Sequence, residues 1–139
     1  MNRHAKAKVL VADDMQDIVE TLGYCLREQG YRVLTASDGE EALEMARAEE
    51  PDLMVLDAMM PKENGYQVAR YVREDERTGL IAKRTRILML TARTTEKNRE
   101  EFLQTWSGAD AFMYKPFDLE ELMGRVDELL ARSSPRPSS

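Results

Sequence analysis

Short apolar runs alternate with stretches of helical periodicity along the whole chain. Each run is bounded by polar or turn residues, which is typical of the buried strands of a parallel sheet. The runs cover residues 8–12, 32–36, 53–56, 86–90 and 111–114. Between and after them, apolar residues recur every three or four positions, which indicates amphipathic helices. We expect one helix to begin at a capping box of Ser37 and Glu40, and the others to cover residues 15–29, 65–77, 96–107 and 118–131.

Polar residues follow three of the predicted strands at the point where each strand ends. The run at 53–56 leads directly into Asp57, the first run ends at Asp13 and Asp14, and the fourth ends at Thr91. Open α/β sheets bind their ligands outside the carboxyl ends of the strands. We therefore expect the functional site at this edge of the sheet, with Asp57 at its centre.

The residues after the first strand also favour one strand order. Doubly wound sheets usually have the order 3-2-1-4-5 or 2-1-3-4-5. The first order would need a glycine-rich turn after strand one to hold a dinucleotide, whereas this chain has Asp13 and Asp14, which would repel a phosphate unless a cation lay between them. We predict a flavodoxin-like doubly wound (βα)5 fold with a five-stranded parallel sheet of order 2-1-3-4-5, in which these two acids and Asp57 share one crevice.

Length, charge and cysteine content limit the remaining possibilities. The 139 residues suit one domain, which we place at 8–131 between an N-terminal tail at 1–7 and a flexible Ser/Pro-rich tail at 132–139. A net charge of -6 argues against direct binding to nucleic acid or to an anionic membrane. The single cysteine, Cys25, excludes an intrachain disulfide, and neither a signal peptide nor a membrane-spanning run is present. We expect a cytoplasmic protein.

Three carboxylates in one crevice require a positive partner. They repel one another unless they are protonated or neutralised, and a hard divalent cation with oxygen ligands, Mg2+, would neutralise them. A carboxylate beside such an ion can act as a nucleophile toward phosphorus and form an aspartyl phosphate. The oxygens of the transferred phosphoryl group also need neutralising, and Lys115 and Thr91, at the ends of two further strands, are placed to contribute.

These motifs together resemble one protein family. They are the acid pair Asp13-Asp14, Asp57 ahead of Met60-Pro61 and Asn64-Gly65, Thr91-Ala92, and Lys115-Pro116-Phe117. In this order, at the ends of strands one, three, four and five, they are similar to the receiver domain of bacterial two-component response regulators. The resemblance covers residues 8–131.

The resemblance implies an acidic metal site around the phosphoacceptor. Asp57 would accept the phosphoryl group and also contribute to the metal site. Asp14 would bind Mg2+ directly, and Asp13 would act mainly through water. The backbone carbonyl oxygen of Met59 would be a further ligand.

The resemblance also implies a set of switch residues. Lys115 would pair with the phosphoryl group and, before phosphorylation, with Asp57. Thr91, followed by Ala92, would donate its hydroxyl to a phosphoryl oxygen and move toward the phosphate. Phe112 falls on the switch aromatic, which would turn inward into the vacated space. The peptide bond that precedes Pro116 would be cis.

The function implied is a phosphorylation-dependent signalling switch rather than an enzyme with a separate substrate. A sensor histidine kinase, or a phosphotransfer protein, would donate the phosphoryl group, and the receiver would catalyse its own phosphorylation and a slow autodephosphorylation. The output would pass to a downstream effector protein or to an output domain missing after residue 139. It would act through a surface formed by the helix at 96–107, the strand at 111–114 and the helix at 118–131, which could also form a homodimer.

Three other functions compete with this interpretation. A receiver that acts by protein contact without phosphorylation is the main alternative, although the complete set of acids, Thr91 and Lys115 argues against it. An aspartyl-phosphate phosphatase of the dehalogenase type would need a second acid two residues after the nucleophile, where this chain has Met59. A flavodoxin-like nucleotide binder would need a phosphate-binding loop after strand one in place of the acid pair.

Overall fold

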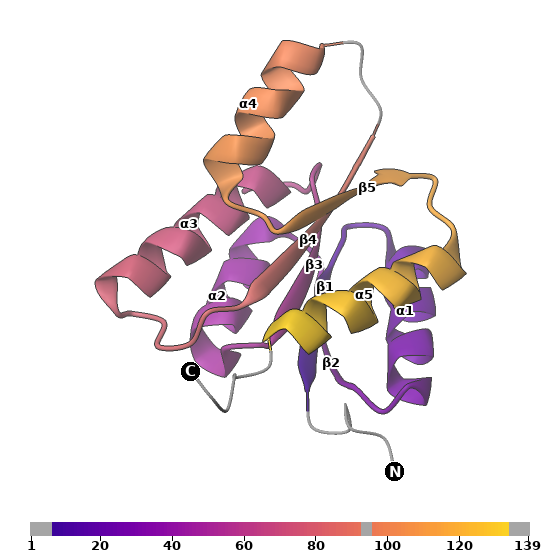
Figure 1. The fold of residues 1–139 in the computed structure, drawn as a ribbon. Coiled ribbons are helices and arrows are strands. Elements are labelled where there is room, and N and C mark those ends of the chain that lie inside the picture. The colour runs from indigo at the N-terminus through magenta and orange to yellow at the C-terminus, as the bar shows by residue number, and fades with distance from the viewer. Residues whose placement is uncertain (1–6, 93–95, 134–139) are drawn as a thin grey trace.

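The computed structural model describes residues 7–92 and 96–133, which form a five-stranded parallel sheet and five helices (Figure 1). The strands pair in the order β2-β1-β3-β4-β5, as the sequence predicts. Their bounds are β1 Lys8–Ala12, β2 Arg32–Ala36, β3 Leu53–Asp57, β4 Arg86–Ala92 and β5 Ala111–Lys115. The helices are α1 Gln16–Glu28, α2 Gly39–Glu49, α3 Gly65–Thr78, α4 Lys97–Ser107 and α5 Leu119–Ser133.

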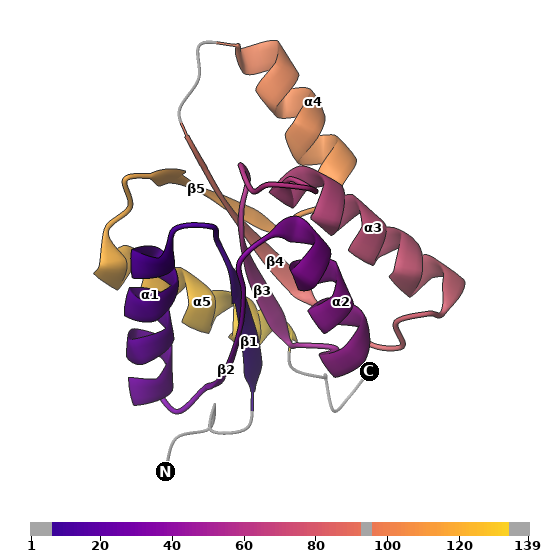
Figure 2. The same cartoon turned by 180° about the vertical axis from the view of Figure 1, so that it is seen from behind.

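The sheet separates two apolar layers. Helices α1 and α5 cover one face, and α2 and α3 cover the other, with α4 packed against α3 (Figures 1 and 2). All five residues of β3 are buried, because this central strand is covered on both faces and paired on both edges. Successive residues of β1, β3 and β4 alternate between the two apolar clusters, as the two-residue period of a strand requires.

The predicted elements differ from the observed ones mainly at their ends. Helix α5 continues to Ser133, past the predicted end at residue 131, while residues 1–6 and 134–139 of the predicted tails lie outside the described residues. The capping box predicted for Ser37 is wrong. Helix α2 begins at Gly39, so Asp38 is the N-cap, and its side chain accepts a hydrogen bond of 2.8 Å from the Glu41 amide. Ser37 lies outside the helix and donates to the Glu41 carboxylate.

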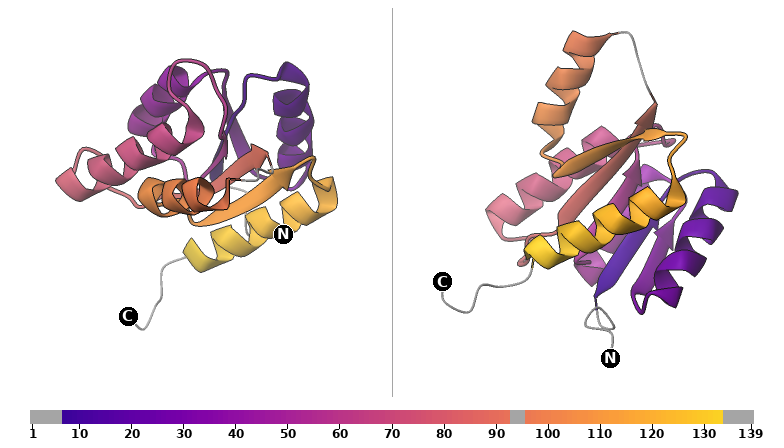
Figure 3. Two further views of the ribbon diagram at one scale, coloured as in Figure 1. Left: turned by 90° about the horizontal axis from the view of Figure 1, so that it is seen from above. Right: turned by 45° about the vertical axis from the view of Figure 1, so that its right-hand side comes forward.

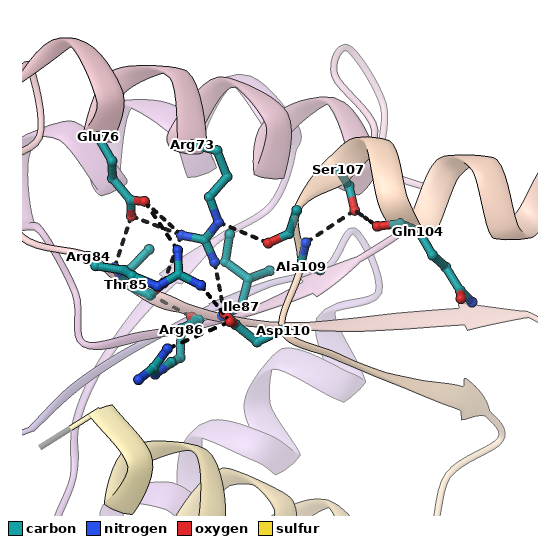
Figure 4. A network of polar contacts seen from close by, with 11 residues as sticks. Arg73, Glu76, Arg84, Thr85, Arg86, Ile87, Gln104, Ser107, Ala109 and Asp110 are labelled. Carbon is teal, nitrogen blue, oxygen red and sulfur yellow. Dashed lines mark hydrogen bonds and ion pairs between the residues drawn. The ribbon is translucent and has the colours of Figure 1, made fainter.

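A network of polar contacts joins α3 to the amino ends of β4 and β5 (Figure 4). Arg73 of α3 donates to the carbonyl oxygens of Gly108 and Thr85, at 2.9 Å each. The same guanidinium pairs with Glu76 at 2.9 Å and with Asp110 at 2.8 Å. The network therefore fixes the residues that precede β4 and β5 at the end of the sheet opposite the strands' carboxyl ends.

No helix in the described ranges has both the length and the apolar character needed to cross a bilayer. Helix α4 is the most exposed of the helices packed on its side of the sheet, since Ser107 is its one buried residue. In the right-hand view of Figure 3, α4 projects above the other helices.

Candidate phosphoacceptor site

Three acidic side chains meet at the carboxyl ends of β1 and β3. These strands are neighbours in register, with Ala12 opposite Leu56, so the residues that follow them lie side by side. One carboxylate oxygen from each of Asp13, Asp14 and Asp57 lies within 4.8 Å of the others. Asp13 and Asp57 are only 1% and 4% exposed, whereas Asp14 is exposed to solvent. The structure thus brings together the three acids that the sequence places at these strand ends.

Lys115 supplies a positive charge to this cluster. It is the last residue of β5, and its ammonium nitrogen lies 3.0 Å from Asp13 Oδ2 and 3.2 Å from Asp57 Oδ1. The Lys115–Pro116 peptide bond is cis. Burial lowers the pKa of Lys115, but the hydrogen bond to Asp13 and the charge of Asp57 outweigh it, so the pKa lies above its usual value. The ammonium group therefore stays charged at neutral pH.

One ammonium group does not neutralise three carboxylates. Burial, followed by the charge of Asp13, raises the pKa of Asp57 above its ordinary value, and the opposing effects of Lys115 and of the Met59 amide do not cancel the increase. The cluster therefore retains unbalanced negative charge. Its donors are all oxygen atoms, the ligand type that hard divalent cations take, so the arrangement fits such a cation.

Backbone amides orient the two buried carboxylates. The Met15 amide donates to Asp13 Oδ1 at 2.9 Å, and the Met59 amide donates to Asp57 Oδ1 at 3.3 Å. Lys115 also contacts Asp57 through Oδ1, so both contacts fall on the same oxygen. The side chain of Met59 points to solvent and is 72% exposed, which leaves its backbone as the part that belongs to the site.

The segment between β3 and α3 is held closely against its surroundings. The Gly65 amide donates to the Ala58 carbonyl at 3.0 Å, and a Cβ atom on Gly65 would lie 2.4 Å from the Asp57 carbonyl oxygen. At the other side of the segment, a Cβ atom on Gly39 would lie 1.8 Å from the Glu63 carbonyl oxygen. Both glycines are therefore required by close approach of backbone to backbone.

Lys62 adds an electrostatic contact to the same segment. Its φ of 70° is in the left-handed region, and its ammonium lies 3.2 Å from Glu40 and 3.6 Å from Asp38 at the start of α2. Neither Lys62 nor Gly39 was a predicted site residue. The Asp38-Gly39 pair was a detectable signal, since such pairs mark turns, but nothing in the sequence shows which backbone would approach it.

Thr91 and Phe112, two of the predicted switch residues, lie on the α3 side of the sheet. Thr91 is 7% exposed, and its hydroxyl accepts a hydrogen bond of 3.2 Å from the hydroxyl of Tyr66, a residue that the sequence did not single out. Ala92, the last residue of β4, is exposed and lies opposite Lys115 in the ladder. Phe112 of β5 is partly buried and packs against the apolar cluster under α2 and α3. Asp57 and Lys115 are thus in direct contact, while the hydroxyl of Thr91 is bonded to Tyr66.

Comparison with known protein families decides the class of this site. The sequence profile of the response regulator receiver domain matches residues 9–127. The chain belongs to this family. It is therefore a receiver domain of a response regulator, with the five-stranded order 2-1-3-4-5 described above.

Relatives of this receiver domain are regulatory proteins of bacteria. The alkaline phosphatase synthesis transcriptional regulatory protein PhoP of Bacillus subtilis is 46% identical over 126 residues, which cover 91% of this chain and 49% of PhoP. Response regulator MprA of Mycobacterium leprae is 42% identical over 128 residues, covering 92% of this chain and 53% of MprA. The chain thus spans about half the length of these relatives.

Solved receiver structures share the fold. The Francisella response regulator 1452 receiver domain has a TM-score of 0.78 and 33% identity, and the match covers 92% of this chain and 99% of that one. The Vibrio cholerae chemotaxis protein CheY4 has a TM-score of 0.75 and 31% identity, covering 89% and 98% of the two chains. The receiver fold accordingly accounts for nearly all of the described residues.

Proposed function

We propose that this receiver domain is a phosphorylation-dependent switch in which Asp57 accepts a phosphoryl group from a sensor histidine kinase or a phosphotransfer protein. The observation that carries the proposal is the contact of Lys115 with both Asp13 and Asp57 in a cluster where one ammonium group faces three carboxyl groups. Such a cluster suits a site that binds a cation and a phosphoryl group together.

Mg2+ is the cofactor that the donor set fits best. Asp13, Asp14 and Asp57 would hold it with carboxylate oxygens, and Met59 would contribute its backbone carbonyl. When bound, the ion neutralises the acids and an oxygen of the incoming phosphoryl group. Asp14 is the member of the cluster that is exposed to solvent.

The protein's own groups fit the transfer of a phosphoryl group to a carboxylate. The Met59 amide and Lys115 both contact Asp57 Oδ1, so we expect Oδ2 to attack phosphorus. The new Asp57 Oδ2–P bond would form as the P–N bond to the donor imidazole breaks, and the bonding electrons would leave with the imidazole nitrogen. Lys115 would remain with the phosphoryl oxygens, and Thr91 would supply a hydroxyl. Slow hydrolysis of the acyl phosphate by water would reset the switch.

The alternatives are less well supported. A dehalogenase-type phosphatase would need an acid at position 59, and the Met59 side chain found there is apolar and exposed. A receiver that signals by contact alone would not need a lysine that pairs with two buried acids. For the output, we propose a downstream effector or a linked output domain that recognises α4, β5 and α5, with homodimerisation as a further use of that surface.

Intact mass spectrometry tests the proposal directly. The chain is incubated with Mg2+ and acetyl phosphate, and Asp57→Asn is compared with Asp17→Asn, which removes an exposed carboxylate on α1. We expect one phosphoryl adduct in the wild type and in Asp17→Asn, and none in Asp57→Asn. An adduct of equal abundance in Asp57→Asn would show that another residue is the acceptor. Mg2+ binding without any adduct in the wild type would favour signalling by contact alone.

A further inference from the structure

We infer that Tyr66 is a positioning residue for the switch: its buried hydroxyl holds the Thr91 hydroxyl in an arrangement that phosphorylation of Asp57 must break. This inference rests on the proposed function, because it assigns a role to Tyr66 in the reaction of that site. Nothing in the sequence motifs points to Tyr66, since position 66 is simply the second residue of α3.

The hydrogen bonds of the two hydroxyls form a short chain. Tyr66 Oη donates to Thr91 Oγ1 at 3.2 Å, and Thr91 Oγ1 donates to the Ala92 carbonyl at 3.5 Å. Both side chains are 7% exposed. A threonine hydroxyl has one proton, so in this arrangement the proton of Thr91 is used by Ala92. Thr91 can donate to a phosphoryl oxygen on Asp57 only after this chain of hydrogen bonds rearranges.

Tyr66 is fixed relative to Asp57 by the start of α3. Asn64 and Gln67 form a complete capping box at this helix end, and the Gly65 amide is bonded to the carbonyl of Ala58, the residue after Asp57. The start of α3, which carries Tyr66, is therefore tied to the segment that follows Asp57, whereas Thr91 belongs to β4. The hydrogen bond between the two hydroxyls links the start of α3 to β4.

The surroundings leave room for the two hydroxyls to separate. Tyr66 and Thr91 both line a cavity of about 480 Å³, whose other walls include Met59, Glu100 and Leu103. A side chain next to such a space can change rotamer without displacing the close-packed core. The bond from Tyr66 is thus one of the two hydrogen bonds that oppose movement of the Thr91 hydroxyl.

Removal of the Tyr66 hydroxyl should favour the phosphorylated arrangement. Tyr66→Phe keeps the aromatic ring and deletes the donor, so Thr91 loses one of the two bonds that hold it. One neutral hydrogen bond changes an equilibrium by about two- to tenfold. We expect Tyr66→Phe to take up phosphoryl groups from acetyl phosphate about two to ten times faster than the wild type at saturating Mg2+, with unchanged affinity for Mg2+.

A double-mutant cycle separates this effect from a loss of packing. Thr91→Val removes the Thr91 hydroxyl and keeps the branched shape, so Tyr66→Phe should not change the phosphorylation rate in the Thr91→Val background. In that background Tyr66→Phe should raise the melting temperature, because it removes a buried hydroxyl whose acceptor is gone. Tyr71→Phe, at a 40% exposed position of the same helix, is the matched control and should behave as the wild type.

The possible outcomes distinguish this inference from the proposed function. A wild-type chain that forms no adduct would refute the proposed function and the inference with it. A wild type that is phosphorylated at Asp57, with Tyr66→Phe equally fast or slower, would overturn the inference alone. An equal change of rate by Tyr66→Phe in the Thr91→Val background would overturn it as well. Faster phosphorylation that depends on Thr91 would establish the positioning role.

Discussion

Asp57→Asn should stabilise the folded chain in the absence of divalent cations. The substitution replaces a buried carboxylate with a neutral side chain of nearly the same shape. The carboxamide oxygen of the introduced asparagine can still accept from the Met59 amide, and Lys115 keeps its contact with Asp13. The variant thus removes a charge without opening a cavity or leaving Lys115 unpaired.

The expected magnitude follows from three opposing contributions. At an effective dielectric constant of about 20, two carboxylates 4.8 Å apart repel by about 3–4 kcal/mol. On the same scale, attraction between Asp57 and Lys115 at 3.2 Å is about 5 kcal/mol. Removal of a carboxylate from water costs several kcal/mol more, so the charged form is disfavoured overall. The raised pKa of Asp57 also means that the folded state disfavours the charged carboxylate. We expect a gain of about 1–2 kcal/mol in the free energy of unfolding, or about 3–8 °C in Tm.

Denaturant and thermal unfolding at pH 7, with chelator or with Mg2+, test this prediction. The wild type should gain stability from Mg2+ by mass action, and Asp57→Asn should gain less, so the order of stability reverses. Asp17→Asn serves as the control for net charge, because it removes an exposed carboxylate outside the cluster. A variant less stable than the wild type without metal, or equal stabilisation of both by Mg2+, would refute the argument.

The same comparison has a predictable dependence on pH. A carboxyl group whose pKa is raised in the folded state stabilises the fold when it is protonated, and this contribution is lost as the pH rises through the raised value. The advantage of Asp57→Asn should therefore be largest at pH values above the raised pKa of Asp57 and shrink as the pH falls through it. Urea unfolding at a series of pH values measures the stability difference between Asp57→Asn and the wild type. A difference that grows on acidification would contradict this prediction.

Two further predictions concern the framework around the site. Gly39→Ala should destabilise the fold by about 2–3 kcal/mol, because the new Cβ atom would lie 1.8 Å from the Glu63 carbonyl oxygen. Gly124→Ala, at a position in α5 with open space around it, should be neutral or stabilising by up to about 1 kcal/mol. Thermal unfolding of both variants checks this prediction. Arg73→Ala should cost about 2–3 kcal/mol, because it removes a partly buried guanidinium that donates to the carbonyl oxygens of Gly108 and Thr85 and pairs with two carboxylates. Arg84 remains as a partner for both carboxylates, which limits the loss. Arg77→Ala, at a 70% exposed side chain, should change stability by less than about 0.5 kcal/mol, and similar losses for the two arginine variants would show that the network is not structural.

The strand ends could be predicted because two simple rules fix them. Short apolar runs give the strands, and parallel connection puts all their carboxyl ends at one edge, so Asp13 and Asp57, which follow or end the neighbouring strands β1 and β3, had to lie side by side once the order was chosen. Lys115 lies at the same edge, but β4 separates its strand from β3, so its contact with Asp57 depends on the reach of a long side chain. The order itself followed from the chemistry of the acid pair. Helix ends were harder: the N-cap of α2 is Asp38 rather than Ser37, because both residue types can cap a helix and the choice depends on where the backbone turns.

The contacts that sequence reasoning missed share a physical cause. Tyr66 meets Thr91 across 25 positions, and Arg73 meets Asp110 across 37. Such pairs depend on the distance between α3 and the strands, which the periodicity of either segment does not determine. Gly39 belongs to the same class, because the backbone that approaches it comes from another loop. Local patterns predict which face a residue occupies, whereas side-chain partners across elements require the packed structure.

The two ends of the sheet differ in how well their charges are balanced. At the amino ends of β4 and β5, Arg73 is only 13% exposed and its donors meet carbonyl oxygens and carboxylates, so that end is neutralised and fixed. At the carboxyl ends, three acids share one lysine and the pKa of Asp57 is raised. A cation and a phosphoryl group can change the energy of that end by several kcal/mol, while the opposite end holds the strands in register. The proposed phosphorylation of Asp57 would therefore act at the end of the sheet where charge is unbalanced, while the network at the other end holds β4 and β5 in place.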